Sequence, residues 1–178
     1  MIHLISVEGE NAKHFYLDQQ YIPDFKSLVR TVTSGRVMMV STKFRSDLFY
    51  NAAKPENDSI LKMWALYAKT DLSVIDSNEI VTSIGAEESL SKYFKSINKL
   101  SSNWHKYMLY SKTFRLTFHN DQQNPVARIL VGCDQHLVEH PSTKRAALVD
   151  ISERIVSELT KDTFSLAMRI INNENSSN

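Results

Sequence analysis

Short apolar segments of two kinds alternate along the first half of the chain, and this alternation is the strongest constraint on the fold. Residues 2–7 and 36–41 are short apolar or alternating runs, which are typical of strands. Residues 23–33 and 59–69 repeat their apolar side chains at the spacing of a helix. Because strands interleaved with helices build a sheet covered by helices, the sequence predicts an α/β (or α+β) fold with a mixed β-sheet of about five strands.

Further elements are expected between these segments and after them. Thr42 is placed as the N-cap of a helix over residues 43–53, since a threonine hydroxyl accepts the free N–H groups of a first turn. Glu87 and Glu88 favour the start of a long helix that reaches about Tyr110, because carboxylates suit the positive end of a helix dipole. The remaining two are a helix over residues 11–22 and a strand over residues 72–75.

The last third of the chain is predicted to hold a β-hairpin followed by a long C-terminal helix. Residues 113–119 alternate between apolar and polar side chains, and residues 126–133 supply an apolar return strand. The C-terminal helix is expected to begin at residues 141–142 and to carry an apolar stripe. The polar residues 172–178 predict a disordered tail. With 178 residues in all, residues 1–171 are predicted to form a single domain.

Cysteine content and hydropathy bear on the compartment. The chain has one cysteine, Cys133, so it forms no intramolecular disulfide, which suits a reducing compartment. The first residues lack the basic and apolar regions of a secretory signal, and no apolar run approaches the ~18 residues of a membrane span. We therefore expect a cytoplasmic protein with no membrane association.

Basic residues gather in two blocks, although the formal net charge of the chain is only +1. Residues 25–46 and 91–120 contain no aspartate or glutamate. Like charges repel, so clusters of this kind usually serve an anionic partner. The alternative is that acidic segments neutralise both blocks in the folded chain.

The second basic block predicts a binding surface for nucleic acid along a helix and the strand that follows it. Its lysines gather on one edge of the predicted helix, Tyr110 supplies a ring for base stacking, and the next strand extends the row of cations. Binding of this kind is weakly sequence-specific and weakens with salt, because it works by counterion release. The predicted interface consists of Lys92, Lys95, Lys99, Lys106, Tyr110, Lys112 and Arg115.

The segment CDQHLVEH is the densest in metal-binding residue types. His136, Glu139 and His140 match the H-x-x-E-H pattern of some zinc proteases, but Pro141 would end the required helix at the second ligand. Read instead as three ligands, Cys133, His136 and His140 form a candidate zinc site that needs a distant fourth ligand. A loop without metal that holds a structural histidine or two is the preferred interpretation of the same residues, and a Cys133 nucleophile with His136 as its base is the other catalytic interpretation.

A second metal hypothesis rests on carboxylates. Glu8 and Glu10 follow the first strand, and Asp76 and Glu79 follow the strand expected at residues 72–75. If these strands are parallel, the four acids converge at one edge of the sheet and could hold Mg²⁺ for a nuclease. Surface acids at strand ends are also common without metal.

Three functions follow from these observations. The leading hypothesis is a nucleic-acid-associated accessory or regulatory protein that binds a polyanion through its basic surface. The alternatives are a metal-dependent hydrolase or nuclease using Zn²⁺ or Mg²⁺, and a protein-interaction module that forms a homo-oligomer through its C-terminal helix. No catalytic motif decides whether the chain is an enzyme.

Overall fold

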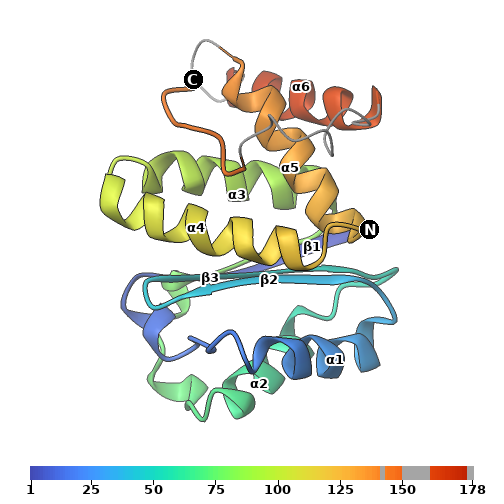
Figure 1. Ribbon diagram of the computed structural model, residues 1–178. Helices are drawn as coiled ribbons and strands as arrows, with labels where there is room; N and C mark the ends of the chain where they lie inside the picture. The colour runs from blue at the N-terminus through green and yellow to red at the C-terminus, as the bar shows by residue number, and fades with distance from the viewer. Residues whose placement is uncertain (141–142, 150–160, 176–178) are drawn as a thin grey trace. The chain divides into compact units, whose positions relative to one another are not determined.

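The computed structural model describes residues 1–140, 143–149 and 161–175. These residues form an α+β architecture with one four-stranded antiparallel sheet and six α-helices (Figure 1). The chain divides into two compact units, Met1–Ser89 and Leu90–Asn178. The predicted combination of helices with a sheet is confirmed. The mixed sheet of about five strands is corrected to four antiparallel strands in the described residues, while the single domain over residues 1–171 stays a prediction.

The sheet of the first unit has the strand order β2-β3-β1-β4, and every neighbouring pair runs antiparallel. The central strands are β1 (Ile2–Glu8) and β3 (Arg45–Asn51), and the edge strands are β2 (Val37–Thr42) and β4 (Ile80–Ser83). The strands predicted at residues 2–7 and 36–41 are therefore confirmed as β1 and β2.

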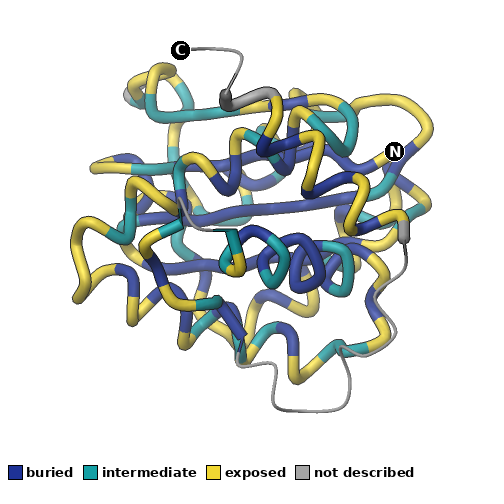
Figure 2. The backbone as a smooth tube through the Cα atoms, turned by 90° about the horizontal axis from the view of Figure 1, so that it is seen from above, coloured by how far each residue is buried: buried dark blue, intermediate teal, exposed yellow. Residues whose placement is uncertain are grey.

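Helices α1 (Ile22–Thr33) and α2 (Asn57–Tyr67) pack on one face of this sheet (Figure 1). Both were predicted from their apolar periodicity, and Figure 2 shows the resulting alternation of buried and exposed turns along the helices of the chain. The core below the sheet centres on Trp64, which is fully buried. Its indole N–H donates a 2.9 Å hydrogen bond to the carbonyl of Phe15, so a buried polar group is satisfied within the core.

The helix predicted over residues 43–53 is wrong, because these residues contain β3. Thr42 and Arg45 are paired across a two-residue turn between β2 and β3. The Thr42 hydroxyl donates to the Arg45 carbonyl at 2.7 Å and accepts the Arg45 N–H at 3.1 Å. The side chain that was expected to cap a helix therefore closes a hairpin, and both uses rely on the same short-range hydroxyl contacts.

Two further predictions in the first unit are corrected. The strand expected at residues 72–75 is a short 3-10 helix, η2 (Leu72–Val74), and the fourth strand comes later as β4, after η3 (Ser77–Glu79). The Asp71 side chain starts η2 by accepting the Ser73 N–H. Within residues 11–22 only the end of the 3-10 helix η1 (Gly9–Lys13) and the first residue of α1 are helical.

The second unit is helical throughout its regular elements. α3 (Ala86–Leu100) begins in the first unit and continues into the second, where α4 (Trp104–Asn120), α5 (Pro125–Val138) and α6 (Lys161–Asn175) follow. The long helix predicted from Glu87 to Tyr110 is thus two helices. Asn103 separates them, because its side chain accepts the Lys106 N–H at 3.1 Å and caps α4.

The hairpin predicted from residues 113–119 and 126–133 is wrong, since the first segment lies in α4 and the second in α5. Phe114 and Phe118 are buried but Leu116 is 49% exposed, so burial repeats every four residues and not every two. The Asn124 side chain accepts the Val126 N–H at 3.0 Å, and Pro125 occupies the first turn of α5. Asn followed by Pro is therefore a helix start here.

The C-terminal helix is shorter than predicted. Residues 143–149 are not helical, and residues 141–142 and 150–160 lie outside the described residues. α6 packs against α5 and extends through Asn175. The first four residues of the predicted tail are consequently helical, and residues 176–178 lie outside the described residues.

Candidate functional site

The lysines predicted to bind nucleic acid are exposed, but they belong to two helices. Lys92, Lys95 and Lys99 lie on the exposed side of α3, spaced three and four residues apart, while Tyr93 and Ile97 are fully buried. Lys106 is exposed near the start of α4. The structure therefore places a row of three lysines along α3.

Tyr110 is not available for base stacking. Its ring is fully buried, and its hydroxyl lies 3.0 Å from the Tyr93 hydroxyl in a pair that links α4 to α3. A single long helix from Glu87 to Tyr110 would place Tyr110 on the exposed side, outside the apolar stripe. Once α4 starts at Trp104 and continues to Asn120, Tyr110 and Phe114 fall one turn apart on its buried face.

The opposite side of α4 exposes large apolar side chains. Trp104 is 61% exposed, Leu116 49%, Leu109 44% and Met108 39%. Lys112 is exposed and Arg115 is half-buried on the same side of the helix. We call these six residues the α4 surface: Trp104, Met108, Leu109, Lys112, Arg115 and Leu116.

The α4 surface carries no carboxylate, because residues 91–120 contain neither aspartate nor glutamate. Its opposite side holds the buried residues Tyr107, Tyr110, Ser111, Phe114 and Phe118. Sequence reasoning missed Trp104 because it was counted with the buried stripe. The Asn103 cap, which places Trp104 at the first helical position, is the signal that separates it from that stripe.

A buried ion pair holds the segment 143–149 inside the second unit. Arg145 Nη1 lies 2.6 Å from Asp134 Oδ1, and Arg145 Nε donates to the Asn98 side chain at 2.7 Å. Asp134 Oδ2 accepts the Leu148 N–H at 2.6 Å. Burial raises the pKa of the Asp134 carboxyl, and the nearby guanidinium opposes that rise. These contacts join α3, α5 and the segment. The buried charges of Arg145 and Asp134 therefore have a structural role in holding these elements together.

The candidate zinc ligands are not assembled into a site. Cys133 is fully buried, with its sulfur 3.8 Å from the Thr163 carbonyl, and burial raises the pKa of its thiol to about 12. His136 packs its ring against Phe164 at 5.2 Å. Within the described ranges, no three His, Cys, Asp or Glu side chains, His140 included, are grouped so that they could hold a metal ion. A thiol that stays protonated at neutral pH is also a poor nucleophile.

The segments that carry the carboxylates proposed for Mg²⁺ do meet, for a different reason from the one expected, but among the described residues no three acids are grouped so that they could hold a metal ion. β1 and β4 are antiparallel, so the end of β1 meets the start of β4. Each acid there already has a partner. Glu79 accepts the Asn11 N–H at 2.8 Å, and Glu8 accepts from Arg45 at 2.8 Å. Glu10 pairs with Lys13 at 2.9 Å, and Asp76 accepts the Asn78 N–H at 2.9 Å. The carboxylates therefore close a turn.

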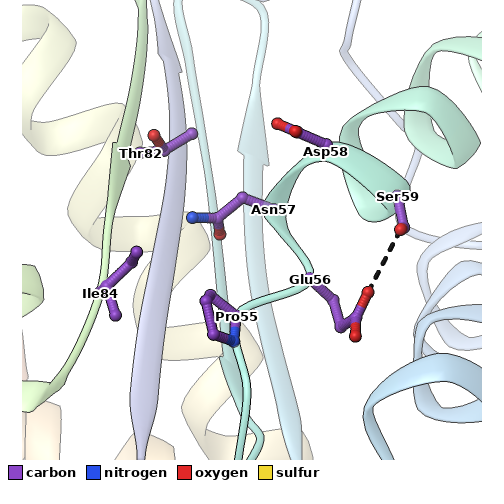
Figure 3. A pocket seen from close by; sticks show the side chains of 7 residues that line it. All are labelled: Pro55, Glu56, Asn57, Asp58, Ser59, Thr82 and Ile84. Atoms are coloured by element: carbon purple, nitrogen blue, oxygen red, sulfur yellow. Dashed lines mark hydrogen bonds between the residues drawn. The ribbon is translucent and has the colours of Figure 1, made fainter.

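A hollow of about 410 Å³ lies between the start of α2 and strand β4 (Figure 3). It is lined by residues 55–59, Thr82 and Ile84. The Ser59 hydroxyl donates to Glu56 at 3.2 Å, and Asn57 accepts from the Tyr50 hydroxyl at 2.9 Å. Glu56 and Asp58 make this hollow unfavourable for an anion, although a helix begins there.

Neither a search for membrane-spanning helices nor comparison with known proteins assigns a function to these sites. Along the described stretches, no helix combines the length and apolar character that crossing a membrane requires. Comparison with known protein families, with curated proteins and with solved structures found no match.

Proposed function

We propose that the second unit binds single-stranded nucleic acid through the α4 surface, in an accessory or regulatory role. The observation that carries this proposal is the exposed Trp104 ring on a helix face that has cations and no carboxylate. Proteins that bind single strands combine such cations with aromatic rings on which bases stack.

Trp104 provides the stacking ring that Tyr110 does not. Its neighbour Tyr107 lies 6.0 Å away in a tilted arrangement and is itself buried, so it supports the indole from below without competing for a base. Stacking on one aromatic ring contributes about 1–3 kcal/mol per base. Because every base has a π-face, this contribution is tolerant of sequence.

Lys112 and Arg115 provide the phosphate contacts on the side of α4 that exposes Trp104. Arg115 lies three turns from Trp104, and Lys112 lies between them. Lys95 and Lys99 on α3 are additional exposed cations of the same unit. The binding constant of a single strand should fall as the salt concentration rises. In a plot of its logarithm against the logarithm of the salt concentration, each phosphate that Lys112 or Arg115 neutralises contributes about 0.7 to the slope.

The chain offers a direct optical test, because it has two tryptophans and only one is exposed. Titration with a short oligothymidylate should quench Trp104 and leave the buried Trp64 unchanged. The variant Trp104→Ala should lose the quenching and bind about tenfold more weakly by anisotropy of a labelled strand. The variant Trp64→Phe, in which Trp104 is the only tryptophan, should retain the full quenching.

Charge variants separate specific contacts from net charge. Lys112→Gln with Arg115→Gln should weaken binding and reduce the salt slope by about 1.4. The matched control, Lys54→Gln with Lys62→Gln, removes the same charge from exposed positions of the first unit and should leave the slope unchanged. Equal losses in both variants, or no quenching of Trp104 at low salt, would overturn the proposal.

A homo-oligomer formed through the C-terminal helix remains the second candidate. The observation that favours it is the exposure of Phe164 and Met168, one turn apart on α6. Light scattering should then give a mass above 20.4 kDa that returns to the monomer value in the variant Met168→Glu. A monomeric mass for the unmodified chain would eliminate this candidate.

A further inference from the structure

The turn between α1 and β2 surrounds a hollow of about 320 Å³ that is lined by Arg30, Ser34, Gly35 and Arg36. Arg30 lies in the last turn of α1, Ser34 is the C-cap of that helix, and Arg36 directly precedes β2. Two arginines and one serine therefore border the same space.

Neither guanidinium is neutralised. Within residues 1–140, 143–149 and 161–175, the side chains of Arg30 and Arg36 form no ion pair or hydrogen bond. The Nε atom of Arg30 is shielded from solvent and still has no acceptor. A shielded donor without a partner is costly, so an acceptor from outside the chain would be bound favourably at this position.

Ser34 adds a second unusual feature. Its φ of 55° lies in the left-handed region, where glycine is favoured at a helix C-terminus and other residues cost about 1 kcal/mol. The Ser34 N–H donates to the Arg30 carbonyl at 3.0 Å, which fixes this conformation. A serine here gives up backbone stability and places a hydroxyl beside the two arginines.

Gly35 keeps the turn rigid. A Cβ atom at this position would lie 1.7 Å from the Asn51 carbonyl oxygen, so no other residue fits against the end of β3. The Asn51 N–H also donates to the Arg36 carbonyl at 2.9 Å. The backbone that carries both arginines and the hydroxyl is thus held by the sheet.

From this arrangement we infer that the Arg30–Arg36 turn binds a phosphate group. Guanidinium groups present planar pairs of N–H donors that match phosphate oxygens, and a tetrahedral dianion accepts from two guanidiniums and a hydroxyl at once. The negative end of the α1 dipole explains the presence of one cation. The dipole does not explain a second arginine beside the same hollow, because like charges repel and none of the residues that line the hollow is acidic. The inference concerns the first unit and is independent of the proposed function of the α4 surface.

Gly35 supplies the readout. The chain has four glycines, and only Gly35 follows a serine, so labelling glycine nitrogen and serine carbonyl carbon identifies its amide signal. Titration of the full chain with inorganic phosphate should shift this signal in a saturable way. Arg30→Gln with Arg36→Gln should weaken binding about tenfold to a hundredfold. The control Lys54→Gln with Lys62→Gln should bind as the unmodified chain does.

The variant Ser34→Gly gives a test with effects of opposite sign. It should raise the melting temperature, because glycine relieves the left-handed conformation, and it should weaken phosphate binding because the hydroxyl is lost. In this variant the Gly35 amide is identified by labelling the nitrogen and the carbonyl carbon of glycine, since no other glycine then follows a glycine. Stabilisation with unchanged affinity would show that Ser34 is no ligand and would overturn its part in the site. Failure of phosphate to shift the Gly35 signal, or equal weakening in the lysine control, would overturn the inference as a whole.

Two sources of the phosphate group are distinguished by further titrations. Adenosine monophosphate should bind as inorganic phosphate does if the site takes free phosphate or a nucleotide. A 5′-phosphorylated oligothymidylate should shift Gly35 where the unphosphorylated strand does not if the site takes the end of a nucleic acid. The Lys112→Gln and Arg115→Gln variant should leave all of these Gly35 shifts unchanged, so failure of the α4 proposal and failure of this inference are distinguishable.

Discussion

In the described part of the chain, each unit buries an arginine against a carboxylate, and the two networks differ in how completely they are satisfied. In the first unit, Arg45 donates through Nε and Nη2 to Asp47 at 2.7 and 3.0 Å and through Nη1 to Glu8 at 2.8 Å. In the second unit, Nη2 of Arg145 is buried and has no hydrogen-bond partner among the described residues. The contact of Arg145 with Asp134 Oδ1 is short at 2.6 Å but is not directed as a hydrogen bond.

The difference follows from the elements that carry the partners. Arg45 and Asp47 are two residues apart on β3 and so lie on one face of the sheet, and Glu8 is directly opposite Arg45 in the register of β1. Arg145 lies in a non-helical segment, and its partners come from α3 and α5. A sheet register thus places donors and acceptors at fixed spacings. A non-helical segment packed among helices has no such repeat to align its donors with acceptors.

The largest expected effect comes from breaking the satisfied network. Arg45→Met should lower the free energy of unfolding by about 4 kcal/mol, because Asp47 is fully buried and would lose its bidentate partner. Urea unfolding followed through Trp64, in a Trp104→Phe background, reports on this unit. A loss below about 1 kcal/mol would mean that the network is not a main source of stability in the sheet.

Arg145→Met should cost less, about 2–3 kcal/mol, because Asp134 keeps the Leu148 N–H and can take up a proton. Removing the guanidinium removes an influence that lowers the pKa of Asp134, so that pKa rises further above its unfolded value. A folded pKa above the unfolded one gives stability that is present at low pH and lost as the pH rises through the folded pKa.

The pH dependence distinguishes this interpretation from a simple packing defect. The loss caused by Arg145→Met, measured by urea unfolding monitored by circular dichroism, should be smaller at pH 4 than at pH 8. An equal loss at both pH values would show that Asp134 does not titrate in the variant.

The sequence predicted well the elements that are rich in apolar side chains. α1 and α2 bury side chains at the helical period, whereas β1 and β2 are short runs that are buried almost throughout, so an apolar pattern identifies all four. β3 was missed although it is central. Its charged residues Arg45 and Asp47 neutralise each other two positions apart, which conceals the strand from any pattern based on hydrophobicity.

The candidate interface was predicted in its charge but not in its aromatic residue. Exposure of the lysines follows from their chemistry and needed no knowledge of helix boundaries. Assigning Tyr110 or Trp104 to the surface required the position at which α4 begins, and that depends on the cap at Asn103. The Arg30–Arg36 hollow was contained in the first basic block, but only the fold of the turn brings its two arginines to one space.

A smaller effect is expected at the hairpin that the sequence failed to predict. Thr42→Val keeps the shape of the side chain and removes the hydroxyl that both donates to and accepts from Arg45, so it should cost about 1–2 kcal/mol. The measurement is urea unfolding through Trp64, with Thr31→Val as the control, since Thr31 is exposed on α1. Equal effects of the two substitutions would show that the Thr42 contacts do not hold the turn on which Arg45 depends.

The smallest effect is expected at the exposed ion pair between Lys13 and Glu10, which serves as the solvent-exposed reference for the two buried networks. Its 2.9 Å separation is similar to the contacts of Arg45 and Arg145, but the two side chains are 54% and 87% exposed. Water screens such a pair and restricting two long side chains offsets most of the attraction, so Lys13→Ala should change stability by less than about 0.5 kcal/mol. Urea unfolding in low and in high salt checks this. If Lys13→Ala cost as much as Arg145→Met, separation and not burial would set the energy of these pairs, and the contrast between the two networks would lose its physical basis.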